Sequence, residues 1–200
     1  KSSFVLLEVK QITESNFLNL KNCLYVINEG STLNLFTNQF FSTSDEIEDN
    51  EPLCERFLNE LETRRSFNVK GKKCLVLQCG EINIIKNLQK EENRPIFRLQ
   101  QRKDLEERFG KIINNSDIII NPIHTPMGNQ GKMKKRRDFF SNDGRYYFSV
   151  SQNGTRKRGE TECDIPIGGD SLQYSYYNGS QIKESSRDIT QDYQKRVFKI

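Results

Sequence analysis

The stretch 72–83, which reads Lys-Lys-Cys-Leu-Val-Leu-Gln-Cys-Gly-Glu-Ile-Asn, constrains the fold more than any other part of the chain. Its run 74–77 is too apolar for a surface loop and too short for a helix, so it predicts a buried strand over 74–79. Gly80 follows at once and permits the sharp change of direction that ends a strand. We therefore expect the Cys79 thiol at the carboxyl edge of a sheet, where open α/β sheets bind ligands and where a turn can expose a nucleophile.

The composition indicates a globular chain with a core. Of its 200 residues, 34% are hydrophobic and 29% charged, and the apolar residues cluster in runs, which excludes disorder throughout. The net charge of +4 is too small to indicate nucleic-acid binding. No signal peptide or apolar run of about 18 residues is present, so we expect a soluble protein. Because the chain starts at Lys1 rather than Met, we expect one domain over 1–200 that belongs to a longer protein.

The cysteines and the histidine limit the redox and metal chemistry expected of the chain. No two cysteines form a CxxC pair and the chain has one histidine, so we expect neither a zinc site nor another metal or cofactor. Free thiols in apolar strands are typical of a reducing cytoplasm. The cysteines are Cys23, Cys54, Cys74, Cys79 and Cys163.

Apolar patterning predicts a chain of mixed strands and helices, which is typical of an α/β layered fold. Helical spacing of apolar residues predicts helices at 52–64, 102–114 and 130–142. Strands are expected at 4–9, 23–28, 33–36, 74–79, 117–121, 146–151, 172–177 and 196–200.

Turn signals join some of these strands. A hairpin is expected through 29–32, and another through 177–180, where Asn178-Gly179 supplies the positive φ angles of a tight turn. The segment 152–170 is rich in glycine and charge without periodicity, so we expect a long, mobile loop there.

Two hypotheses are open for the role of Cys79. As a nucleophile, it needs partial exposure and a nearby base, and Glu81 lies close enough to orient a substrate. As a core residue, it would simply pack, since free cysteine is among the most buried residue types. His124 follows the apolar strand 117–121, on the side where Cys79 would emerge from a parallel neighbour; it is either a structural residue or part of the same site.

The basic run 131–137 is expected to be a solvated helix face, because it lies within a predicted helix and the net charge is low. Nucleic-acid contact is the alternative.

An ordered set of segments carries a resemblance to a known superfamily. The set begins with the strand 74–78 followed by Cys79-Gly80-Glu81 and continues with 116–122, which reads Ser-Asp-Ile-Ile-Ile-Asn-Pro. It ends with the helix 132–141 leading into the strand 145–153, and with Ser171-Leu172-Gln173-Tyr174 and Asn178-Gly179. In order and spacing these segments resemble the carbon–nitrogen hydrolase (nitrilase) superfamily.

The resemblance implies an α-β-β-α sandwich, here without its first strand and helix, in a homodimer or larger assembly. It implies hydrolysis of an amide or nitrile through a covalent intermediate on cysteine, with a glutamate as base and a lysine at the tetrahedral intermediate. Cys79 matches the nucleophile and Gly80 an oxyanion donor, while Glu81 and His124 fall at the substrate.

The chain departs from the superfamily pattern at two positions. Asn38 stands at the apparent lysine position and could donate a hydrogen bond to substrate but not supply a cation. The general-base glutamate would precede Lys1, whereas the second glutamate is expected at Glu46 or Glu48, of which we take Glu46 as catalytic. A catalytically degenerate binding or interaction module of the same fold is therefore the alternative to an amidase.

Overall fold

The computed structural model describes the backbone of residues 4–9, 23–28, 31–35, 39–123, 130–151, 154–158, 161–167, 174–189 and 194–198. Side chains are described within 39–123, 131–149, 174–188 and 196–198.

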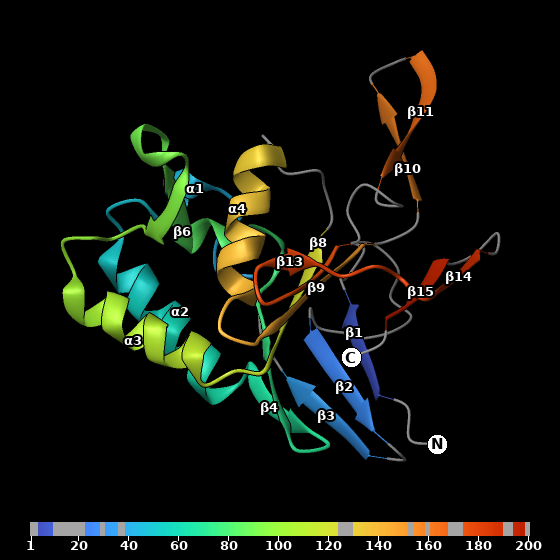
Figure 1. The fold of residues 1–200 in the computed structure, drawn as a ribbon, viewed down its shortest axis with the longest axis horizontal. Coiled ribbons are helices and arrows are strands. Elements are labelled where there is room, and N and C mark those ends of the chain that lie inside the picture. Colours follow the sequence, from blue (N-terminus) through green and yellow to red (C-terminus); the bar gives the residue numbers. More distant parts are fainter. Residues whose placement is uncertain are drawn as a thin grey trace, which may run out of the picture.

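A six-stranded mixed sheet forms the centre of the described fold (Figure 1). Its inner strands β5 (Lys72–Val76), β8 (Ile118–Ile123) and β9 (Tyr146–Ser151) run parallel. The strand order is β13-β12-β9-β8-β5-β4, and β4 and β12 pair antiparallel with their inner neighbours. The outer strands are β4 (Ser66–Val69), β12 (Ser175–Tyr177) and β13 (Ser180–Gln181).

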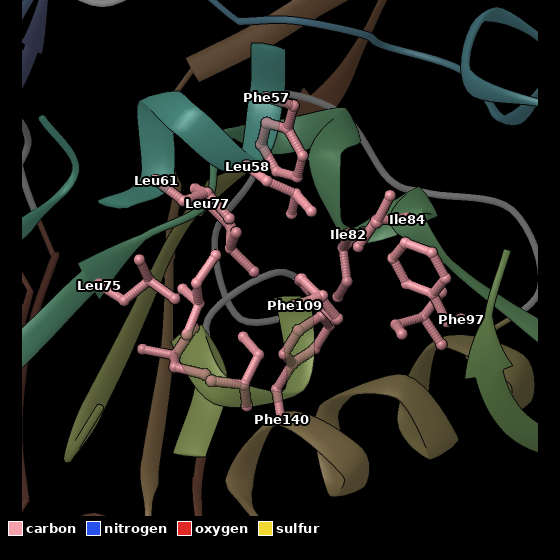
Figure 2. Close-up of a cluster of buried hydrophobic side chains, with 14 of the residues drawn as sticks. Phe57, Leu58, Leu61, Leu75, Leu77, Ile82, Ile84, Phe97, Phe109 and Phe140 are labelled. Carbon is pink, nitrogen blue, oxygen red and sulfur yellow. The ribbon is translucent and has the colours of Figure 1, made fainter. Parts of the chain in front are cut away.

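Helices cover one face of this sheet and form the core with it (Figure 1). The apolar spacing in α2 (Glu51–Thr63) and α3 (Lys103–Asn114) places one face of each helix inside the fold. The same core includes alternate positions of the inner strands, such as Leu75, Ile119 and Tyr147. In Figure 2, the side chains of Phe57, Leu58, Phe109 and Phe140 point toward one another; Phe140 comes from α4 (Gln130–Ser141).

The opposite face of the sheet is also apolar but is less completely covered. Ile118, Ile120, Tyr146 and Phe148 are half-buried there, and the rings of Tyr146 and Phe148 stack with centroids 6.1 Å apart. Exposed Tyr177 stacks on Tyr146 at 4.4 Å. The α/β class expected from the sequence is therefore confirmed, with a mixed sheet whose two faces are both apolar.

Smaller sheets accompany the central one. β1 (Phe4–Val9), β2 (Cys23–Asn28) and β3 (Ser31–Leu35) form an antiparallel three-stranded sheet. Antiparallel pairs are formed by β6 (Ile85–Leu88) with β7 (Arg94–Phe97) and by β14 (Ser186–Ile189) with β15 (Gln194–Val197). Short helical segments are α1 (Ser44–Ile47), η1 (Cys79–Ile84) and η2 (Gln89–Glu91).

Both expected hairpins are confirmed. β2 pairs with β3 across the first turn, from Asn28 to Ser31. Across the second, Tyr177 pairs with Ser180, and Asn178 and Gly179 have φ angles of 48° and 74°. Positive φ at both central residues is what a tight turn matched to strand twist requires.

The expectation that 152–170 is wholly a loop is wrong. The segment contains β10 (Gly154–Arg158) and β11 (Thr161–Ile167), which pair antiparallel (Figure 1). Because both strands contain charged residues, the sequence shows no apolar alternation there. A two-stranded ribbon does not need such alternation, since it need not bury either face.

None of the helices in the described part of the chain has both the length and the apolar character that a membrane span requires.

Candidate functional site

Cys79 lies just past the carboxyl end of β5, as the sequence predicts, although the strand itself ends at Val76 rather than at Cys79. The Leu77 amide donates to the Ile120 carbonyl at 2.9 Å, which keeps the chain beside β8 for one more residue. Cys79 then begins the helical turn η1. Its side chain is 7% exposed and packs beside Ile123, the last residue of β8.

Gly80 allows a second segment to lie directly on this turn. A Cβ atom at Gly80 would overlap the backbone carbonyl of Ser42. The Asn83 side-chain amide also donates to that carbonyl, at 3.3 Å. Glycine is therefore required here by close backbone approach, because any side chain would push the segment 39–43 away.

The Glu81 carboxylate is fully buried and binds groups of the protein itself. It pairs with the Arg65 guanidinium, which is also fully buried. The amides of Phe40 and Gln78 donate to it at 2.8 and 2.7 Å. Burial raises the pKa of the Glu81 carboxyl, while Arg65 and the two amides oppose that rise. In this arrangement Glu81 holds the turn after β5 in place.

The remaining residues expected at the site are dispersed or lie outside the described residues. The Glu46 carboxylate accepts from the backbone amides of Ser42 and Thr43 at 2.5 and 3.3 Å, and so it caps the start of α1. Asn38 and His124 are not among the described residues. His124 is adjacent in sequence to Ile123, which packs beside Cys79.

A buried polar network lies on the neighbouring parallel strands. Tyr147 of β9 donates its hydroxyl to Asn121 Oδ1 at 2.8 Å, and Asn121 Nδ2 donates to the Leu77 carbonyl at 2.7 Å. Burial raises the pKa of the Tyr147 hydroxyl; the Arg137 guanidinium opposes the rise and Cys79 adds to it. The network therefore joins the chain just before Cys79 to β8 and β9.

The expectation that 131–137 is a solvated helix face is wrong for its last two residues. Arg136 and Arg137 are both buried. Arg136 donates to Asn87 Oδ1 and Asn83 Oδ1 at 2.8 and 2.6 Å, and burial lowers its pKa to about 10. Charge alone gave no signal for this, because burial depends on what packs over the helix.

Arg137 stacks on an aromatic ring from another part of the chain. Its Cζ atom lies 3.8 Å from the ring centroid of Tyr174 and 5.8 Å from that of Tyr176. Tyr174 is held by its own amide, which donates to Ser149 Oγ at 2.8 Å. Sequence reasoning missed Arg137, Tyr147 and Asn121 as members of this region.

The thiols of Cys54 and Cys74 differ from an ordinary thiol because they are buried. Burial raises the pKa of Cys54 to about 12 and that of Cys74 to about 11. Neither thiol forms a disulfide among the described residues, and neither does that of Cys79. Since the thiolate is the reactive form, Cys54 and Cys74 are expected to be inert at neutral pH.

Labelling with iodoacetamide, followed by peptide mass spectrometry, checks this expectation. At pH 8 a thiol of pKa near 11 is ionised in about one molecule in a thousand, so labelling of Cys74 should be slow. Because the pKa is raised, its rate should increase about tenfold per pH unit until the pH approaches about 11. Rapid labelling of Cys74 at pH 8 would contradict the assigned burial.

A separate hollow of about 550 Å³ lies against the C-terminal strands, and Cys79 does not line it. Two of its basic side chains lie at Glu184, whose carboxylate pairs with Arg187 at 2.8 Å and lies 3.6 Å from Arg196. The lining residues are Ser175, Gln181, Ile182, Lys183, Glu184, Arg187, Arg196 and Phe198.

No cluster of three or more histidine, cysteine, aspartate or glutamate side chains that could hold a metal ion occurs among the described residues. The chain matches no protein-family model. A search of curated proteins also finds no match. The function of the chain is therefore inferred from its sequence and its geometry.

Proposed function

We propose that this protein is a carbon–nitrogen hydrolase of amidase type that uses Cys79 as its nucleophile. The observation that supports this most is the position of Cys79, just past the inner parallel strand β5 and beside the end of β8. In open α/β sheets this edge is where ligands bind. The ordered segments that resemble the nitrilase superfamily support the same reaction class.

The proposed reaction has two covalent steps. The Cys79 thiolate attacks the carbonyl carbon of an amide, the C–N bond breaks, and the amine leaves with a proton. A water molecule then attacks the resulting thioester, releasing the carboxylic acid and restoring the thiol. Glu46 and Asn38 are proposed near the substrate with Gly80, Glu81 and His124; the capping bonds of Glu46 would have to open for it to act as a base.

The sheet supports the α-β-β-α sandwich that this proposal carries with it. Helices pack on one face, and the half-buried aromatic and aliphatic residues of the other face, such as Ile120 and Phe148, suit a second sheet. We also propose a homodimer or larger assembly, because the resemblance to the nitrilase superfamily implies one. We also propose a reducing, cytoplasmic location, which is supported by the absence of a disulfide at Cys54, Cys74 and Cys79.

Two experiments test the role of Cys79. Iodoacetamide should label Cys79 faster than Cys74, because a nucleophile must reach its thiolate form near neutral pH. Replacing Cys79 with alanine should abolish amide hydrolysis, whereas Cys74→Ala, in the same stretch of chain, should retain it. Unchanged turnover in the Cys79→Ala variant would sink the proposal.

The alternative is a catalytically degenerate module of the same fold that binds a ligand or partner. The specific observations favouring it are that Glu81 is fully occupied by Arg65 and two backbone amides and that an uncharged Asn38 stands where a lysine is expected. This alternative predicts no hydrolysis by the full-length protein over a broad panel of amides. Robust turnover of any of them would refute it.

A further inference from the structure

Arg137 is a buried cation whose charge the described fold does not neutralise. The residue is 4% exposed, and its Nε has no hydrogen-bond partner among the described residues. Within the described ranges no carboxylate pairs with it. A buried charge without a partner is costly, so an uncompensated guanidinium in the interior indicates a group that binds there.

The other buried arginines of the described chain show that the fold otherwise satisfies such groups. Arg65 pairs with Glu81, and Arg98 donates to Glu48 and to the Asn83 carbonyl. Arg136 binds two asparagine oxygens, and Arg145 binds the Phe140 carbonyl and Asn114. Arg137 is the exception among these five.

Stacking holds the Arg137 guanidinium in place without occupying its N–H groups. Tyr174 packs against the flat face of the guanidinium, with Cζ 3.8 Å from the ring centroid. Stacking leaves the N–H groups at the edge of the plane, where they can bind a carboxylate as a fork. The rings fix the orientation and supply no negative charge.

Arg137 and Cys79 are connected through the same neighbour. Tyr147 lies on β9, beside β8, whose last residue Ile123 contacts Cys79. The Tyr147 ring lies 6.5 Å from the ring of Tyr176, whose centroid is 5.8 Å from Arg137 Cζ. The Tyr147 hydroxyl binds Asn121, whose side-chain amide binds the Leu77 carbonyl, two residues before Cys79. The cation and the thiol therefore belong to one buried region at the carboxyl edge of the sheet.

We propose that Arg137 binds a carboxylate of the ligand held at Cys79, so that the substrate is an amide that also carries a carboxylate. This inference rests on the proposed function, because the ligand is a substrate only if the protein hydrolyses it. Binding of a carboxylate by Arg137 does not itself require hydrolysis. Arg137 is a binding residue in this scheme, and Cys79 remains the group that reacts.

The test uses two alkylating reagents that differ mainly in charge. Iodoacetate carries a carboxylate and iodoacetamide a neutral amide, and both alkylate the same thiol. The ratio of their rates at Cys79, iodoacetate over iodoacetamide, should fall about tenfold in Arg137→Gln, the loss expected for one charged hydrogen-bonded contact. Lys135→Gln, an exposed change in the same helix, removes the same charge and should leave the ratio unchanged.

Arg137→Lys keeps the charge without the fork and should give an intermediate ratio. Should neither variant fold, the unaltered protein gives a second measurement, in which acetate should slow iodoacetamide labelling of Cys79 more than acetamide does. Equal ratios in the unaltered protein and Arg137→Gln, or equal protection by acetate and acetamide, would overturn the inference. Amide turnover without this charge preference would contradict only carboxylate binding by Arg137. Charge preference without turnover would contradict only the proposed hydrolase activity.

Discussion

Replacing Glu81 with alanine is expected to lower the free energy of unfolding by about 3–5 kcal/mol, because it leaves one charge of a buried ion pair without its partner. Arg65 would remain fully buried and positively charged. The amides of Phe40 and Gln78 would lose their acceptor at the same time. Urea unfolding followed by circular dichroism measures the loss.

An exposed ion pair provides the matched control. Glu62 pairs with Arg108 at 2.5 Å, and both side chains are partly in water. Glu62→Ala should therefore cost less than about 1 kcal/mol. Equal losses in the Glu81 and Glu62 variants would show that burial does not set the strength of the Arg65 contact.

Gly80→Ala should also be strongly destabilising, by about 3 kcal/mol, at the upper end of what overpacking costs. The added Cβ would meet the backbone of Ser42 rather than the end of a flexible side chain. The segment 39–43 would have to move, and with it the Phe40 amide that binds Glu81. Thermal unfolding measures the effect.

Gly110→Ala is the control, since it makes the same substitution where there is space. Gly110 lies within α3, and a Cβ atom there meets nothing within 4 Å. Alanine is a better helix former than glycine, so this variant should gain about 0.5–1 kcal/mol. A stable Gly80→Ala protein with an unmoved 39–43 segment would contradict the close packing described at Ser42.

Long apolar or periodic segments of this fold could be predicted from the sequence. The helices α2 and α3 and the strands β1, β2 and β9 lie where their patterns indicate, because burial against one face imposes a period on the residues. The short strands β4, β6 and β7 were not predicted. Each has four residues, too few to show a period, and β7 includes Pro95, which is unusual in strands.

The candidate site could be predicted only where it depends on local sequence. The position of Cys79 after a buried strand follows from the neighbouring residues. The burial of Arg137 does not, because it depends on Tyr174 arriving from a distant part of the chain. The ion pair of Glu81 with Arg65 likewise joins residues whose contact only the folded sheet determines.

The bond between the Phe40 amide and Glu81 joins residues 41 positions apart. Glu81 is three residues beyond Gln78, and both amides share its carboxylate. The turn that carries the thiol and the segment that follows position 38 are therefore one mechanical unit. Sequence drift in either segment would be transmitted to the other, so the two should tolerate substitutions only in compatible combinations.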